Sequence, residues 1–321
     1  MRGMKKFALL ALLPAIFCAV PVARAQAPLP PPSAPRLPMT TVFKGDAKFQ
    51  ALVLQAERER WRELPLGART IRVARALVGT PYINYSLEVD DSIESPVVNL
   101  TGMDCWTYYE NALAFARMLR YKPAPYVPQD MLAMVEVERY RNGQCTGGYL
   151  SRMHQLEEVF YDNERRGLAQ NITPRLPGAQ RLTREIHEMT VQWKNYRYLR
   201  SNPALLPAMG KIEEAVSKLP VYHIPKDKVL AVEPYLQDGD VCAITCYDKD
   251  SYTSHVGMIV RLQNRAYFTH ATSDRDKGRM VIIDTPITDY LKEGSKHAGI
   301  VILRPRDVPP SPLWQKNMAG R

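Results

Sequence analysis

One cysteine stands where the chain could carry a nucleophile. Cys105 follows the short extended run 95–102 and opens a segment whose apolar residues recur at three- and four-residue steps as far as Leu119, which predicts an amphipathic helix. Unpaired backbone N–H groups and the positive end of the dipole at a helix N-terminus favour an anion. We therefore expect the thiolate, which is the reactive form of cysteine. The structural alternative is a small buried apolar side chain.

Two histidines occupy positions from which they could serve this thiol. His255 begins one β-rich run and His270 ends the next, with a turn at Gln263-Asn264 between them. Antiparallel pairing would bring both histidines to the open end of the hairpin. One imidazole could then act as the base for Cys105 while the other orients it. The structural alternative for each histidine alone is a polar residue that ends a strand.

Helical patterns come first along the chain and β-rich runs come later. We expect helices at 46–63, 67–78, 105 onward, 129–141, the segment ending near 166, 181–193 and 204–218. Strands are expected at 240–247, 255–262, 265–271, 279–283 and 299–303. This order predicts an α+β fold in which the cysteine helix packs on an antiparallel sheet.

The two ends of the chain differ from the middle in composition. A basic start, an apolar run from Phe7 to Val20 and Ala23-Arg-Ala25 predict a secretory signal peptide, residues 1–25. A Pro-rich tether is expected over 26–42, a single domain over 43–308 with helical insertions at about 122–220, and a loose tail over 309–321. The mature protein is expected to be exported to the periplasm or secreted, without an integral membrane segment.

The net charge narrows the range of partners. The whole chain carries +10, and removal of the four leader cations Arg2, Lys5, Lys6 and Arg24 leaves +6. A moderately basic exported protein suits an anionic polymer such as the cell wall. Nucleic acid is not expected as a partner, because the basic residues are spread over several predicted helices and the leader directs export.

The other cysteines favour neither a metal site nor a stapled scaffold. On a strand, Cys242 and Cys246 would lie about 13 Å apart, too far for a shared zinc ion or a disulfide. No HExxH helix is present, because Met189-Thr-Val follows His187-Glu188. We expect no metal and no other cofactor. Cys145 is the cysteine for which we hypothesise a disulfide, to Cys242 or Cys246.

Seven segments in one order resemble a known family. They are Gly79-Thr-Pro-Tyr82, Met103-Asp-Cys-Trp-Thr107 with Glu110 and Ala114, Gly148-Tyr-Leu-Ser-Arg-Met-His154, Leu236-Gln-Asp-Gly-Asp240, Ser254-His-Val-Gly257, His270-Ala271 and Leu303-Arg-Pro305. Together they resemble the N-acetylmuramoyl-L-alanine amidase-like branch of the NlpC-type, papain-like cell-wall hydrolases.

The resemblance implies roles for individual residues. Cys105 would be the nucleophile, His255 the general base and then acid, and His270 the residue that fixes the tautomer of His255. Residues that would contact the peptidoglycan or muropeptide substrate are Tyr82, Asp104, Tyr149, Arg152, His154 and Ser254. A supporting structural role is the alternative for these six.

Three features depart from the family pattern. Tyr252 stands where an aspartate is usual three residues before the catalytic histidine, and Trp106 stands where a small hydroxyl residue is usual. The loop 272–278 is longer and more charged, so it could reshape one rim of the cleft.

Two other functions remain open. Cleavage of the γ-D-glutamyl–diamino acid bond would use the same catalytic residues. A cell-wall-binding module without turnover is the alternative from another class, although a module of that kind would be expected to have lost the cysteine or a histidine.

Overall fold

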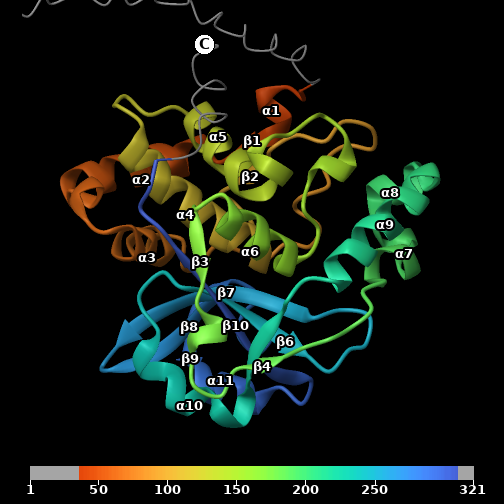
Figure 1. Cartoon of the computed structure of the whole chain (residues 1–321). Helices are drawn as coiled ribbons and strands as arrows, with labels where there is room; N and C mark the ends of the chain where they lie inside the picture. The colour runs from red at the N-terminus through yellow and green to blue at the C-terminus, as the bar shows by residue number, and fades with distance from the viewer. Residues whose placement is uncertain (1–35, 310–321) are drawn as a thin grey trace, which may run out of the picture. The chain divides into compact units, whose positions relative to one another are not determined.

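A computed structural model describes residues 36–309, in which helices cover one face of an antiparallel sheet (Figure 1). The strand order is β4-β5-β10-β6-β7-β8-β9, and β3 pairs with β10. The strands are β3 (Ala169–Asn171), β4 (Gln180–Arg181), β5 (Tyr222–Pro225), β6 (Val241–Cys246), β7 (Thr253–Leu262), β8 (Arg265–Ala271), β9 (Val281–Pro286) and β10 (His297–Pro305). A separate parallel pair joins β1 (Phe43–Lys44) to β2 (Val98–Asn99). The predicted α+β class is confirmed.

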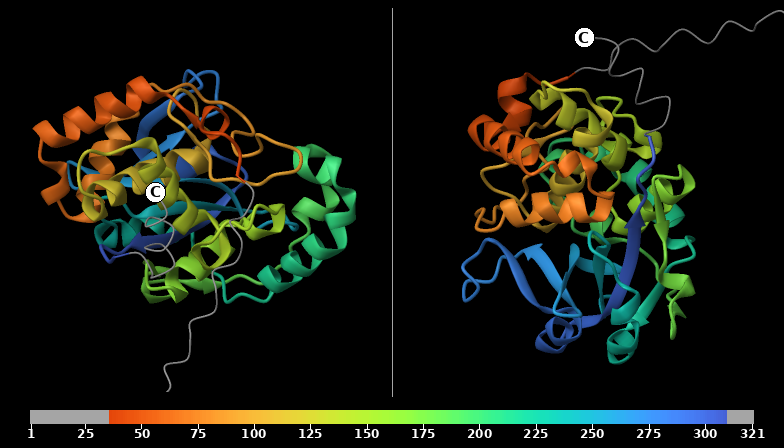
Figure 2. Two further views of the ribbon diagram at one scale, coloured as in Figure 1. Left: turned by 90° about the horizontal axis from the view of Figure 1, so that it is seen from above. Right: turned by 90° about the vertical axis from the view of Figure 1, so that its left-hand side faces the viewer.

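The helices form three groups (Figures 1 and 2). The layer above the sheet contains α1 (Met39–Val42), α2 (Asp46–Arg58), α3 (Leu66–Ala76), α4 (Cys105–Tyr121), α5 (Pro128–Arg139) and α6 (Leu156–Arg165). Beside it lie α7 (Glu188–Val191), α8 (Arg197–Ser201) and α9 (Leu206–Ser217). Beneath the opposite face of the sheet lie α10 (Val229–Val232) and α11 (Ile287–Glu293).

Alternating side chains of the central strands pack into two apolar cores. On β7, Val256 and Met258 join the cluster that contains the buried face of α4. Ile259 faces the other way and packs in a second cluster with Phe268 and residues of α11. Because successive side chains of a strand point to opposite faces, this register places His255 on the α11 side of the sheet.

The central helix α4 begins where its sequence supplies a cap. The Asp104 carboxylate accepts a hydrogen bond from the Thr107 N–H at 2.8 Å, and the Thr107 hydroxyl accepts one from the Asp104 N–H at 3.1 Å. This reciprocal capping box satisfies two backbone donors at the helix start. It fixes Cys105 as the first helical residue, as the apolar periodicity predicts.

Buried ion pairs join α4 to α5. Arg117 pairs with Glu138 at 2.6 Å and Arg139 pairs with Glu110 at 2.6 Å, and all four side chains are at most 5% exposed. Removing one partner of a buried pair typically costs about 3–5 kcal/mol, because the other charge stays buried. These pairs therefore hold the helix of Cys105 in one position against its neighbour.

The segment 181–193 is not the helix that the sequence predicts. Its first residue, Arg181, ends β4, and the α-helical part is Glu188–Val191. The Leu182 N–H donates to the Val221 carbonyl, and the Arg184 guanidinium donates to the carbonyls of Ser251 and Cys246. These long-range hydrogen bonds outweigh the local helical pattern. They join residues far apart in the chain, so the local pattern does not reveal them.

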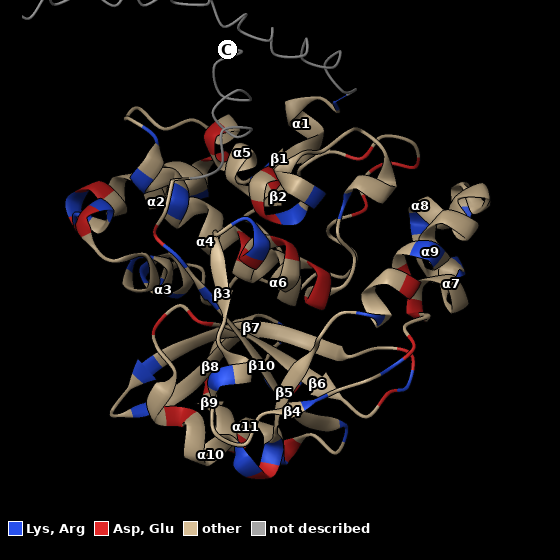
Figure 3. Cartoon of the chain, in the orientation of Figure 1, with Lys and Arg blue, Asp and Glu red and all other residues tan. Residues whose placement is uncertain are grey.

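The ends of the chain are described only in part. The predicted signal peptide, residues 26–35 of the predicted tether and most of the predicted tail lie outside the described residues. Residues 39–42, at the end of the predicted tether, form α1. Within residues 36–309, no helix is long and apolar enough to cross a membrane. Basic and acidic residues alternate over the helices and the sheet in Figure 3 and are not separated onto different elements.

Candidate active site

The start of α4 meets β7 at the residue after His255. The sulfur of Cys105 lies against the backbone N–H of Val256 and against the first N–H groups of its own helix. Cys105 as a residue is partly exposed. The helix cap and the packing of α4 on β7 therefore bring the thiol to the start of the strand that carries His255.

The two histidines are in direct contact. His255 Nε2 lies 2.7 Å from His270 Nδ1, with the two ring planes nearly perpendicular. Tyr290 of α11 packs against both imidazoles. The contact expected from the β7–β8 hairpin is therefore present. Among residues 36–309, no hydrogen bond directly joins the thiol of Cys105 to His255.

Asp284 extends the pair and was missed in the sequence. His270 Nε2 lies 3.1 Å from Asp284 Oδ2, and the Lys277 ammonium donates to the same oxygen at 2.7 Å. The strand expected at 279–283 stops one residue before Asp284, whereas β9 continues to Pro286. The available signal was an acidic residue directly after an apolar strand, next to the strand that ends at His270.

The direction of the hydrogen bonds follows from Asp284. Burial alone would raise the pKa of its carboxyl, but hydrogen bonds from His270 and Lys277 hold that pKa well below its usual range. An ionised carboxylate only accepts, so His270 must donate from Nε2 and accept at Nδ1. His255 then donates from Nε2, which leaves the lone pair on its Nδ1 available.

The pKa shifts of Cys105 and His255 both favour the neutral form of the group. Burial raises the pKa of Cys105 to about 12, and the nearby Asp104 carboxylate adds to the rise. Burial also lowers the pKa of His255 well below its usual value, with a further contribution from His270. The direction of the Cys105 shift opposes the expected thiolate, because the effect of burial on the pKa is larger than that of the helix N-terminus.

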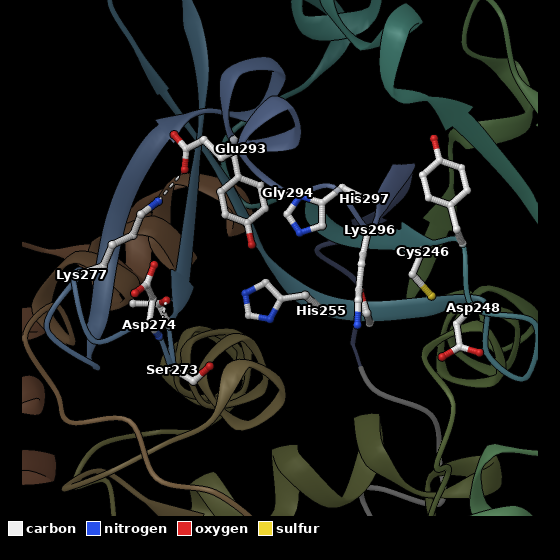
Figure 4. Close-up of a pocket in the computed structure, with 14 residues that line it drawn as sticks. Cys246, Asp248, His255, Ser273, Asp274, Lys277, Glu293, Gly294, Lys296 and His297 are labelled. Atoms are coloured by element: carbon white, nitrogen blue, oxygen red, sulfur yellow. Dashed lines mark hydrogen bonds and ion pairs between the residues drawn. The ribbon is translucent and has the colours of Figure 1, made fainter.

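A pocket of about 750 Å³ opens beside His255. In Figure 4, His255 lies between Lys277 and Glu293 on one side and Lys296 and His297 on the other. Residues 272–274 and Lys277 also line it, so the charged loop 272–278 forms part of the rim. The pocket is lined mainly by polar and charged side chains. These suit a ligand that carries charges of both signs.

Three of the predicted substrate contacts lie close to the thiol or the pocket. Ser254 lines the pocket. Tyr82 is half-buried near Cys105; burial is the main cause of its raised pKa, and Cys105 is the second. Asp104 uses one carboxylate oxygen to cap α4 and accepts a hydrogen bond from Ser86 at the other, at 2.6 Å. Asp104 is thus fully engaged within the protein.

The other three predicted contacts form a buried network. Arg152 pairs with Glu88 and Glu94 and lies over the Tyr149 ring. The His154 ring packs against the same tyrosine at a tilted angle, and its Nε2 lies 3.2 Å from the Tyr149 carbonyl. None of the three lines the pocket beside His255. The geometry gives them a structural role, and substrate binding by them stays a prediction.

The residues that depart from the family pattern are both engaged internally. Tyr252 is fully buried, and its hydroxyl oxygen accepts a hydrogen bond from the Arg184 N–H at 3.3 Å. The Trp106 indole donates to Glu110 at 2.8 Å, the same carboxylate that pairs with Arg139. Trp106 therefore links the residue after the thiol to the buried ion pairs of α4 and α5.

The cysteines outside the site are buried thiols. Cys145, Cys242 and Cys246 are all free, so the hypothesis that Cys145 forms a disulfide with Cys242 or Cys246 is contradicted. The Cys145 thiol instead donates to the Glu94 carbonyl at 3.3 Å. Within residues 36–309, no group of three or more His, Cys, Asp or Glu side chains is placed to hold a metal ion.

A thiol at a helix start beside a sheet-borne histidine pair and a carboxylate is the kind of site found in hydrolases that attack acyl groups. The chain belongs to the AmiA-like, N-acetylmuramoyl-L-alanine amidase-like family, whose model matches residues 72–300. It is therefore an amidase-like hydrolase. No curated protein matches the chain.

Solved structures agree with this family. An N-acetylmuramoyl-L-alanine amidase from Bacteroides uniformis superposes with a TM-score of 0.67 at 28% identity, over 75% of this chain and 99% of that one. A Bacteroides fragilis protein provisionally named a xylanase gives 0.63 at 30% identity, over 73% and 99%. A Legionella pneumophila protein gives 0.57 at 19% identity, over 83% and 98%, which supports the fold alone.

Proposed function

We propose that the protein is a papain-like, NlpC-type cysteine hydrolase that cleaves the amide between N-acetylmuramic acid and L-alanine in peptidoglycan. The observations that carry this proposal are the approach of the Cys105 sulfur to the N–H of Val256, the residue after His255, and the chain of hydrogen bonds from His255 to His270 and Asp284. The family and the Bacteroides uniformis amidase support the substrate class.

The reaction would begin from the neutral thiol and imidazole. As the sulfur of Cys105 bonds to the lactyl carbonyl carbon, the thiol proton passes to Nδ1 of His255. His270 and Asp284 support the cation that forms, because each accepts a hydrogen bond along the chain of contacts. Collapse of the tetrahedral intermediate breaks the C–N bond, and His255 gives its proton to the leaving alanyl nitrogen.

Water would complete the cycle. His255 takes a proton from water as its oxygen attacks the thioester carbon, and the proton returns to the departing sulfur, which leaves the free muramoyl acid and the thiol. The backbone N–H groups of Cys105, Trp106 and Val256 partly offset the rise in the thiol pKa. The same donors would stabilise the oxyanion of both tetrahedral intermediates.

The pocket supports an orientation for the substrate. Since His255 protonates the leaving amine, the departing stem peptide lies on the His255 side, where the pocket is lined by Lys277, Lys296 and several acidic residues. A stem peptide carries carboxylates and an amine, so it matches this lining. We infer export from the basic and apolar leader, which would bring the enzyme to its substrate.

Glycosidic cleavage is not favoured by the carboxylates near the histidines. Glycoside hydrolases use two carboxyl groups, one as an acid and one as a base or nucleophile. Asp284 is committed to His270 and Lys277, and Glu293 is paired with the same lysine. The name of the Bacteroides fragilis relative therefore does not transfer to this chain.

Digestion of a defined muropeptide tests the proposal. N-Acetylmuramoyl-L-alanyl-D-glutamyl-diaminopimelate should yield N-acetylmuramic acid and the intact tripeptide, identified by mass spectrometry. Release of free diaminopimelate would instead assign the γ-D-glutamyl endopeptidase activity. Binding without any product would assign the non-catalytic wall-binding role.

A further inference from the structure

Tyr85 combines exposure with an unusual backbone conformation. It is 67% exposed, and its φ of 55° lies in the left-handed region, which glycine and asparagine adopt far more readily than an aromatic residue. Such a conformation persists only where surrounding contacts impose it, and it is concentrated at binding and catalytic sites. Tyr85 is therefore held in place at a conformational cost.

Two attachments beside the thiol impose this conformation. On one side, the Ile83 N–H donates to the Met103 carbonyl at 3.1 Å. On the other, the Ser86 hydroxyl donates to the Asp104 carboxylate at 2.6 Å. Met103 and Asp104 directly precede Cys105 in the sequence. The segment that presents Tyr85 is thus anchored on both sides to the residues that position the nucleophile.

Tyr82, three residues before Tyr85, forms a parallel β-bridge with Met103, two residues before Cys105. Burial is the main cause of the raised pKa of Tyr82, and the thiol of Cys105 and the phenol of Tyr85 both add to it. Both groups therefore lie near Tyr82. Neither tyrosine lines the pocket beside His255, so the exposed ring of Tyr85 lies outside the surface assigned to the leaving peptide.

We propose that Tyr85 is the platform on which the saccharide ring of the substrate packs, an inference that rests on the proposed function. The leaving amine and its peptide occupy the His255 side, so the acyl half extends away from His255. That half consists of the lactyl group and the N-acetylmuramic acid ring. An exposed aromatic face packs well against the apolar C–H face of a pyranose.

Two substrates that differ only in the sugar test this role. One is N-acetylmuramoyl-L-alanyl-D-glutamate, and the other is D-lactoyl-L-alanyl-D-glutamate, which has the same scissile amide without the sugar. Replacing Tyr85 with Ala or Gly should lower kcat/KM on the muramoyl substrate about tenfold and leave the lactoyl substrate within about twofold. Tyr85→Phe, which keeps the ring, should stay within about twofold of the wild type on both substrates.

The matched controls separate the ring from the loop. Glycine suits the φ of residue 85, so Tyr85→Gly removes the ring without strain. Tyr235→Ala removes another exposed tyrosine, 53% exposed and outside the pocket lining, and should leave both rates unchanged. Equal losses on the two substrates, or no loss on the muramoyl substrate, would overturn the inference. Failure of the wild type to cleave the muramoyl substrate would contradict the proposed function itself.

Discussion

Replacing Glu157 with Gln should stabilise the protein in a pH-dependent way. Glu157 lies in the first turn of α6 and is 6% exposed, and no hydrogen bond of normal geometry reaches its carboxylate oxygens. Burial raises its pKa from 4.5 to about 7, although its own N–H and the nearby Thr253 hydroxyl offset part of the rise. Near neutral pH the folded protein must therefore bury a charge or hold a proton.

The sign and size of the effect follow from proton linkage. The folded state binds the proton more tightly than the unfolded chain, so the free energy of unfolding falls as pH rises from the unfolded pKa through the folded one. A pKa difference between 4.5 and about 7 corresponds to a loss of about 3 kcal/mol once both states are ionised. Glutamine is neutral at every pH and has nearly the same shape.

Denaturant unfolding at two pH values measures this prediction. Glu157→Gln should exceed the wild type in free energy of unfolding by about 2–3 kcal/mol more near pH 8 than near pH 5. Glu185→Gln, at a side chain that is 92% exposed, is the matched control and should show no pH-dependent gain. A stability difference that does not change with pH, or one that favours the wild type near pH 8, would refute the reasoning.

Three further predictions concern the catalytic chain. Asp284→Asn should lower kcat about 10- to 100-fold with little change in KM, because it removes the charge that orients and supports His270; a kcat within twofold of the wild type would contradict this. Lys277→Met should move the acidic limb of the pH–rate profile to higher pH. The pKa of His270 is lowered mainly by burial and further by the Lys277 charge, so removing that charge should raise it. An unchanged limb would contradict the coupling. Iodoacetamide labelling of Cys105 should keep accelerating above pH 9, because burial raises the thiol pKa to about 12; a plateau near neutral pH would indicate a resting thiolate.

Local patterns predicted the parts of the site that depend on neighbouring residues. Apolar periodicity placed Cys105 at the start of α4, where the capping box is found. The short turn between two β-rich runs brought His255 and His270 together, at 2.7 Å. Both inferences depend on spacing within one helix or one hairpin, which a single sequence records directly.

The features that escaped prediction depend on contacts across the fold. Asp284 reaches His270 only through the β8–β9 pairing, whose register is irregular. The protonation state of Cys105 depends on how closely β7 and Asp104 surround the sulfur. The helix predicted at 181–193 was replaced by extended chain because Arg184 bonds to carbonyls more than 60 positions away. Long-range packing outweighed local preference in each case.

Turnover by Cys105→Ala tests the central claim most directly. The release of L-alanyl-D-glutamate from N-acetylmuramoyl-L-alanyl-D-glutamate would be followed by mass spectrometry for wild type and variant, with circular dichroism to verify that both are folded. If Cys105 forms the thioester, the variant should lose at least about a thousandfold in kcat. A folded variant that releases the dipeptide within tenfold of the wild-type rate would contradict a cysteine-dependent mechanism.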